Sequence, residues 1–281
     1  MIQIEHLESD ITMACELRCC GCNHLVSLYG AYGKIWKATP SQIQKDLSHL
    51  TTILHAKAWG ALGGEPTLNP LLPEILLEVR LSKISDRIEV WTNGILLSNP
   101  LHPLAIRLWD YPGLATLPLF DDLILSRYEG KLTDKNVEFI QGMCDNLGVK
   151  LTIKDERTWH NFRTNLEPIP TGDNTPETIS KFQGCFFKQY SRVVNRGFFY
   201  MCCCSPHQPV LMQGRSHGSD GIAIEGLTES ALLAYLERTN PLGCCTICAG
   251  RDTAKELVWS EERDPEKWLQ KSKGIVIENL S

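Results

Sequence analysis

Three cysteines near the start of the chain constrain it more than any other feature. They are spaced as Cys15-x3-Cys19-x2-Cys22, directly after an apolar stretch with the character of a β-strand. Thiolates so close together predict a metal site, because they are strong ligands for iron and zinc. A cubane held by four thiolates has every iron occupied, whereas three thiolates leave one iron open to an incoming molecule. The spacing therefore predicts chemistry at a cluster.

Zinc is the competing occupant of this site. Cys19, Cys22 and His24 with one further thiol would complete the tetrahedron that structural zinc sites use. Cys20 is a possible substitute for Cys19, which is selected by spacing alone. The sequence Gly63-Gly64-Glu65-Pro66 follows later in the chain. This context favours iron, since zinc ribbons rarely carry such a motif.

The cysteine spacing and the Gly-Gly-Glu-Pro motif together resemble the radical S-adenosylmethionine (radical SAM) enzymes. The resemblance implies that Cys15, Cys19 and Cys22 hold a [4Fe–4S] cluster whose free iron is chelated by S-adenosylmethionine. It also implies reductive cleavage of the cofactor to a 5′-deoxyadenosyl radical, with an electron donor of the flavodoxin or ferredoxin type. One departure is Gly21, because many members of the family carry an aromatic residue there.

Seven further residues are candidates for cofactor binding. The resemblance implies that Gly63–Pro66 contacts the methionine amino group, with Glu65 as acceptor. Two glycines also let a backbone approach a ligand closely, although a simple glycine turn closed by proline is the alternative. Asn93 ends a predicted strand within a Thr-Asn-Gly that similar enzymes share. Ser126 and Arg127 lie where related enzymes contact the ribose and the carboxylate, and a guanidinium pairs well with a carboxylate.

The composition bounds the class of protein. The chain has 281 residues, 43% of them hydrophobic, enough for one sizeable α/β domain with a small appendage. A net charge of −5 offers no broad basic surface for nucleic acid or an anionic membrane. Neither a spanning apolar run of ~20 residues nor a secretory signal is evident, so we expect a cytoplasmic protein. The twelve cysteines gather in groups, which favours metal ligands over disulfides.

The first 155 residues alternate between strand-like and helix-like patterns, as repeated βα units do. Apolar periodicity predicts helices at 41–54, 71–84 and 134–147. The predicted strands are Ile4–Met13, Lys57–Leu62, Arg87–Thr92, Asp121–Ser126 and Val149–Lys154. The candidate site residues follow strand ends, where parallel barrels place their ligands. The resemblance implies a partial (β/α)6 barrel, which we expect at 1–170 with a connection at Glu167–Pro176.

The remaining residues, 171–281, carry a second group of thiols. Asn195-Arg196-Gly197 predicts a hairpin that leads to Cys202. This layout resembles the SPASM or twitch appendage of radical SAM enzymes. The resemblance implies an auxiliary [4Fe–4S] cluster, and a structural zinc site with the same ligands is the alternative. The four implied ligands are Cys185, Cys202, Cys245 and Cys248.

Adjacent thiols leave the ligand choice open. Cys203 or Cys204 can replace Cys202, and Cys244 can replace Cys245. The family precedent of a cysteine that returns a hydrogen atom makes one of Cys203, Cys204 or Cys244 a candidate donor. The alternative is that these cysteines are buried small hydrophobic residues.

Hydrogen abstraction by the deoxyadenosyl radical is the predicted reaction. Only fourteen residues precede Cys15, so we expect a small-molecule substrate and not a peptide with a leader. Epimerisation of a sugar or aminoglycoside-like carbon is the first choice. Dehydrogenation of the same substrates, crosslinking of a ribosomal peptide and a non-catalytic zinc module are the alternatives. Trp259 and Trp268 belong to a predicted polar helix or cap over the barrel mouth or core.

Overall fold

The computed structural model describes residues 1–110, 118–156, 158–161, 175–248 and 255–272. The chain divides into two compact units. The sheet unit comprises Met1–Ala14 and Trp36–Arg157, and the cysteine unit comprises Cys15–Ile35 and Thr158–Ser281. The predicted boundary at residue 170 and most of the predicted connection Glu167–Pro176 lie outside the described residues.

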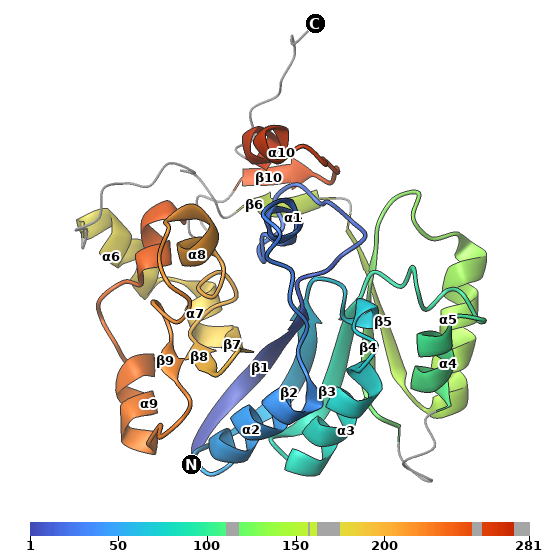
Figure 1. Cartoon of the computed structure of the whole chain (residues 1–281), viewed down its shortest axis with the longest axis horizontal. Helices are drawn as coiled ribbons and strands as arrows, with labels where there is room; N and C mark the ends of the chain where they lie inside the picture. Colours follow the sequence, from blue (N-terminus) through green and yellow to red (C-terminus); the bar gives the residue numbers. More distant parts are fainter. Residues whose placement is uncertain (111–117, 157, 162–174, 249–254, 273–281) are drawn as a thin grey trace, which may run out of the picture. The chain divides into compact units, whose positions relative to one another are not determined.

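The sheet unit contains a parallel sheet (Figure 1). Its strands, in the spatial order β5-β4-β3-β2-β1, are β1 (Ile2–Thr12), β2 (Leu54–Gly63), β3 (Ser85–Thr92), β4 (Asp122–Arg127) and β5 (Lys150–Asp155). The predicted α/β class is confirmed, and all five predicted strands are present. The next strand, β6 (Thr158–Asn161), belongs to the cysteine unit, where it pairs antiparallel with β10 (Lys255–Val258).

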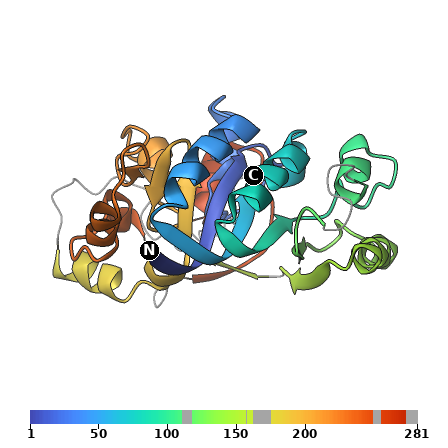
Figure 2. The ribbon, with the colours of Figure 1, turned by 90° about the horizontal axis from the view of Figure 1, so that it is seen from below.

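Four helices accompany this sheet: α2 (Pro40–Leu50), α3 (Leu72–Ser82), α4 (Pro103–Trp109) and α5 (Asp134–Leu147). Figures 1 and 2 show α2 and α3 side by side along the strands. Helix α5 begins at a capping box formed by Thr133 and Asn136 and ends at Gly148, which has a φ of 67°. No helix in the described segments has the length and apolar character that a membrane crossing requires.

The two faces of the sheet differ in chemistry. Side chains alternate across a strand, so Leu7, Trp59 and Ile88, which are in register, share one face. All three are buried, and the helices that follow parallel strands supply the rest of this apolar core. The opposite face carries the polar residues described below.

The cysteine unit is built from short elements. The predicted hairpin is confirmed, because strands β7 (Arg192–Asn195) and β8 (Phe198–Tyr200) pair antiparallel around Arg196 and Gly197. Both turn residues have positive φ, 47° and 83°, as a tight two-residue hairpin requires. The elements of this unit, besides β6 and β10, are α1 (Val26–Ala31), α6 (Pro176–Gln183), α7 (Phe186–Tyr190), β7 (Arg192–Asn195), β8 (Phe198–Tyr200), α8 (Gln208–Met212), β9 (Ile222–Ala223), α9 (Glu229–Leu236), η2 (Gly243–Ile247) and α10 (Pro265–Ser272).

Candidate functional site

The two glycines at the carboxyl end of β2 accommodate the chain that leaves β1. A Cβ on Gly64 would lie 2.1 Å from the Ala14 carbonyl oxygen, and one on Gly63 would lie 2.6 Å from the Thr12 carbonyl oxygen. The amide of Gly64 donates to the Thr12 carbonyl at 2.6 Å, and the amide of Glu65 donates to the Ala14 carbonyl at 2.8 Å. The motif therefore fixes the backbone immediately before Cys15.

Glu65 joins the carboxyl ends of β2 and β3. Its buried carboxylate accepts hydrogen bonds from the amide of Thr67 at 3.1 Å and from the Thr67 hydroxyl at 2.6 Å. It also accepts from the Thr92 hydroxyl at 2.7 Å and from the amide of Asn93 at 2.8 Å. Pro66 begins a short 3-10 helix, η1 (Pro66–Leu68), directly after it. The carboxylate thus organises this edge of the sheet.

Asn93 places a hydrogen-bond donor at the same edge. Its side-chain oxygen accepts from the amide of Ile95 at 2.9 Å. Its side-chain nitrogen is buried and finds no hydrogen-bond partner among the described residues. Gly94 has a φ of 74°, and a Cβ there would lie 2.4 Å from the Leu125 side chain. A buried donor of this kind suits a polar ligand group, because burial without a partner is unfavourable.

Ser126 and Arg127 have partners within the sheet unit. The Ser126 hydroxyl lies 3.5 Å from a carboxylate oxygen of Glu156. Burial raises the pKa of Glu156, with the neighbouring Lys154 acting in the opposite direction. Arg127 pairs with Asp134 at 2.6 Å on the surface. The structure brings both residues to the end of β4, where that ion pair engages the guanidinium.

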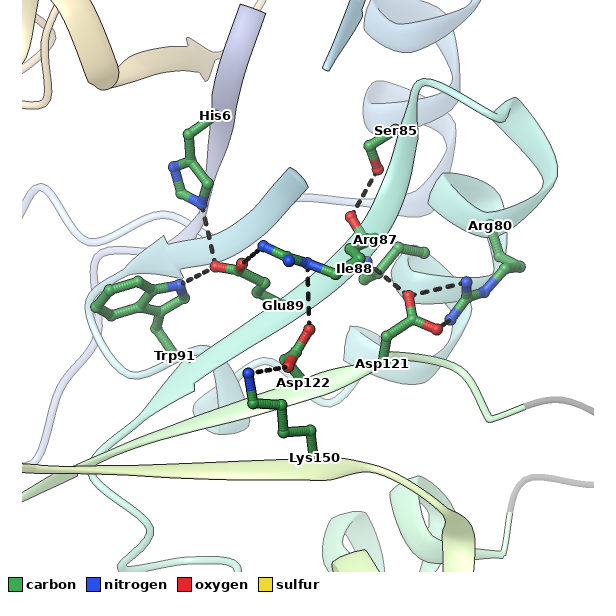
Figure 3. Close-up of polar contacts among 10 residues, drawn as sticks. All are labelled: His6, Arg80, Ser85, Arg87, Ile88, Glu89, Trp91, Asp121, Asp122 and Lys150. Atoms are coloured by element: carbon green, nitrogen blue, oxygen red, sulfur yellow. Dashed lines mark hydrogen bonds and ion pairs between the residues drawn. The ribbon is translucent and has the colours of Figure 1, made fainter. Parts of the chain in front are cut away.

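The face of the sheet opposite the apolar core carries a connected set of polar contacts (Figure 3). His6 on β1 reaches across β2 to Glu89 on β3, with 3.2 Å between Nε2 and Oε2. Glu89 also accepts from the Trp91 indole N–H at 3.0 Å and from Arg87 at 3.0 Å. Gly60 makes this crossing possible, because a Cβ there would lie 3.1 Å from the imidazole.

His6 and Glu89 are both charged at neutral pH. Burial lowers the pKa of His6, but hydrogen bonds to Glu8 and Glu89 outweigh it and raise the pKa to about 9. Burial raises the pKa of Glu89, but the hydrogen bond and charge of His6, with the hydrogen bonds from Trp91 and Arg87, together outweigh it and lower the pKa to about 2. Lys154 lies 3.8 Å from the centre of the Trp91 ring, a cation–π contact.

No sequence motif identifies this face. The available signal is the alternation along β1, where polar residues occupy every second position. Strands buried on both faces are expected to be continuously apolar, so this alternation indicates a polar second face. The residues are His6, Glu8, Asp10 and Thr12.

The first cysteine loop lies in the cysteine unit. The amide of Cys22 donates to the Cys19 carbonyl at 3.4 Å, and Gly21 between them has a φ of 80°. Glycine reaches this left-handed conformation without the steric strain that a side chain would add. Burial raises the pKa of the Cys19 thiol to about 12 in the metal-free chain. Cys20 packs in an apolar cluster, as a small hydrophobic residue does.

His24 connects this loop with the second thiol group. Its ring centroid lies 5.1 Å from that of His207, which follows Cys204 by three residues. The Tyr29 hydroxyl lies 3.0 Å from Nδ1 of His207, and both side chains are buried. The segments that carry the two groups of cysteines therefore lie side by side within this unit.

The second thiol group forms one cluster around Cys202. Its thiol shares hydrogen bonds with the thiols of Cys204 and Cys244. Cys185 lies near Cys202 and Cys245, and burial is the main cause that raises the pKa of Cys185 to about 11. Cys204, Cys244 and Cys185 therefore lie around Cys202, and Cys245 lies near Cys185 and Cys244. None of these five cysteines forms a disulfide.

The other thiols of this group lie nearby in the fold. Cys248 follows η2, and its amide donates to the Cys245 carbonyl at 3.3 Å. Cys203 is 5% exposed, and its thiol contacts that of Cys204. Lys188 and Arg192 stand close enough to the thiols to interact electrostatically with them. Two cations beside grouped sulfurs suit a site that becomes anionic when it binds metal.

Comparisons with known proteins find similarity to solved structures. Neither a family model nor a curated protein matches the sequence. The structure is similar to that of BtrN in complex with AdoMet and 2-DOIA, with 17% identity, a TM-score of 0.47 and coverage of 84% of this chain and 82% of that one. It is also similar to Streptococcus suis SuiB bound to S-adenosylmethionine, with 11% identity, a TM-score of 0.38 and coverage of 71% and 60%. A third is native anSMEcpe with bound AdoMet, with 13% identity, a TM-score of 0.36 and coverage of 68% and 51%. All three of these structures contain bound S-adenosylmethionine (AdoMet).

Proposed function

We propose that this protein is a radical SAM enzyme that abstracts a hydrogen atom from carbon in a small polar molecule. The observation that carries the proposal is a single loop that presents the thiols of Cys15, Cys19 and Cys22, none of them in a disulfide, after a backbone that Gly63 and Gly64 hold in place. Three thiols at this spacing fit a cluster with one open iron. The unpartnered donor of Asn93 fits a polar cofactor.

The remaining cofactor residues take roles that follow from their positions. Glu65 fixes the ends of β2 and β3, while Ser126 and Arg127 stand at the end of β4. When bound, the cluster and S-adenosylmethionine supply a 5′-deoxyadenosyl radical. We assign to Asn93, Ser126 and Arg127 the orientation of the cofactor's polar groups. In this role Arg127 leaves Asp134 and pairs with the carboxylate of the cofactor.

The polar face of the sheet supports a small polar substrate. It offers the Glu89 carboxylate and the Trp91 ring on β3 and the Lys154 ammonium on β5. Carboxylates and ammonium groups recognise hydroxyl and amino groups, and an aromatic ring stacks on a sugar's C–H face. A sugar or aminoglycoside-like molecule matches this set, in which polar groups fix the orientation of a bound ligand.

Epimerisation is the reaction we favour. The substrate C–H bond breaks by loss of a hydrogen atom to the radical, and a thiol S–H returns a hydrogen atom to the opposite face of the carbon. One electron from a flavodoxin- or ferredoxin-type protein and one proton from water then restore the thiol. The candidates are Cys203, Cys204 and Cys244, of which the last two contact Cys202.

Dehydrogenation is the second candidate, favoured by the compact thiol group of Cys185, Cys202 and Cys245. With Cys248 these residues form a full set of four ligands for an auxiliary cluster. In this case the carbon radical loses one electron to the auxiliary cluster and one proton to a base, so that the substrate is oxidised by two electrons in total. A cytoplasmic location of the protein, where thiols stay reduced, suits both reactions.

Anaerobic reconstitution followed by turnover in deuterated water tests these proposals. Two cubanes predict about eight irons per chain and cleavage of S-adenosylmethionine after reduction. One solvent deuteron at a substrate carbon supports epimerisation, and Cys→Ala variants at 203, 204 and 244 identify the donor. An oxidised product without deuterium supports dehydrogenation. A colourless protein that binds zinc, or one that leaves S-adenosylmethionine intact, would refute the enzyme proposal.

A further inference from the structure

A distant segment of the cysteine unit holds the first cysteine loop. We call residues 259–268 the tryptophan segment. It forms an antiparallel bridge with the loop at Cys19 and Glu261. The amide of Cys20 donates to the Ser260 carbonyl at 2.8 Å, and the amide of Glu262 donates to the Arg18 carbonyl at 3.0 Å. The backbone is therefore fixed on both sides of Cys19.

Trp268 adds a third attachment. Its indole N–H donates to the Cys19 carbonyl at 2.9 Å, and its side chain is fully buried. The ring packs in a cluster with Cys20, Leu25 and Leu28 from the loop and helix α1. Burial of so large a ring makes this attachment rigid, because close packing leaves little room for displacement. The loop and the tryptophan segment thus behave as one piece around Cys19.

Trp259 contacts the sulfur atom itself. Its indole N–H donates to Sγ of Cys19 with 3.2 Å between nitrogen and sulfur. The three attachments described above hold Cys19 in place, so this contact follows from the fold of the whole segment. An N–H donor aimed at a sulfur atom stabilises negative charge on that sulfur, whereas an apolar neighbour does not.

We propose that Trp259 is a positioning residue that raises the reduction potential of the first cluster through its hydrogen bond to Cys19. The proposal rests on the proposed function, in which Cys19 is a cluster ligand. Hydrogen bonds to cluster sulfurs are one of the means by which a protein sets the potential, because they favour the more negative, reduced form. One electron from a flavodoxin- or ferredoxin-type donor, or from dithionite in the test, then enters the cluster more readily.

The test is a redox titration of the anaerobically reconstituted full chain, followed by EPR. Trp259→Phe keeps an aromatic ring but removes the N–H donor. At the potential where the wild-type cluster is half reduced, we expect the ratio of reduced to oxidised cluster in Trp259→Phe to be about two- to fivefold lower than in the wild type. A hydrogen bond of ordinary net strength that favours the reduced state has an effect of this size. The change in the EPR signal on addition of S-adenosylmethionine identifies the first cluster.

Two further variants keep the test sharp. Replacement of position 259 by 3-benzothienylalanine keeps the bicyclic shape and exchanges N–H for sulfur, which serves if Trp259→Phe does not fold. Trp109→Phe is the matched control, because Trp109 is a buried tryptophan whose indole N–H has no partner in the described part of the chain. It is expected to leave the potential unchanged.

The outcomes separate this proposal from the proposed function. A wild-type protein without iron, or without an EPR response to S-adenosylmethionine, refutes the proposed function. Where the wild-type protein has both properties, Trp259 variants that titrate at the wild-type potential or at a higher one refute only the role of Trp259. A lower potential in both Trp259 variants, with normal iron content and an unchanged Trp109→Phe control, supports it.

Discussion

Replacement of Glu65 by glutamine tests how the carboxyl ends of β2 and β3 are held together. The carboxylate is buried and accepts from Thr67, Thr92 and Asn93. Three of these bonds converge on Oε1, and the amide of Asn93 points at Oε2. A glutamine retains one acceptor oxygen and replaces the other with a donor group. Its best orientation keeps the oxygen toward the two threonines.

The cost follows from the bond that this orientation loses. The amide of Asn93 then faces an NH2 group instead of a carboxylate oxygen. Loss of a hydrogen bond to a charged group costs about 1.5–3 kcal/mol, and the buried N–H left unpaired costs a further ~1–3 kcal/mol. We expect Glu65→Gln to lower the free energy of unfolding by about 2.5–6 kcal/mol. The opposite orientation disrupts three bonds and costs more.

Urea denaturation of the metal-free protein, followed by circular dichroism, measures this loss without any cofactor. Glu5→Gln is the matched control, since Glu5 pairs with Lys57 on the surface of the same unit. Exposed pairs of this kind contribute ~0–1 kcal/mol. Free energies of unfolding that agree within about 1 kcal/mol for the two variants would refute the claim that Glu65 holds β2 and β3 together.

Three further perturbations have defined outcomes. Gly64→Ala places a Cβ 2.1 Å from the Ala14 carbonyl oxygen and is expected to cost about 1–3 kcal/mol in the same denaturation assay. Gly142→Ala is the control, because a Cβ there meets open space and is not expected to destabilise the protein. Equal denaturation midpoints for the two variants would contradict the close approach at Gly64. The pKa of His6 rises from 6.5 to about 9 on folding, so its stabilisation is complete below pH 6.5 and is lost as the pH rises through 9. The gap in unfolding free energy between wild type and His6→Gln, at most about 3 kcal/mol, should therefore shrink over that range, and a constant gap would refute the ion pair with Glu89. Cys185→Ser is expected to lower the iron content from about eight to about four per chain, and retention of eight would remove Cys185 from the ligand set.

Local signals account for the elements that sequence reasoning predicts well. Helix α5 has the predicted bounds because Thr133 and Gly148 mark its two ends in the sequence. The five strands follow from runs of apolar and β-branched residues between turn signals. Helix α4 (Pro103–Trp109) is missed, since seven residues give too little periodicity to identify.

The site is predictable where its residues share a motif. Spacing finds the three cysteines and Glu65, and the structure describes all of them. The motif spacing does not show that Glu65 is held by Thr92 and Asn93, because those donors come from the next strand. For the same reason the contact between Trp259 and Cys19 has no sequence signal, since 240 residues separate them.

The polar face of the sheet bears on the choice between structure and function. His6 and Glu89 lose hydration on burial, and their mutual attraction must offset that cost. Apolar residues of similar size would stabilise such a position at least as well. Gly60 between them gives up a side chain so that they can meet, which is a further loss for a central strand. A fold selected for stability alone would not combine these features, so their presence on one face favours a ligand-binding surface there.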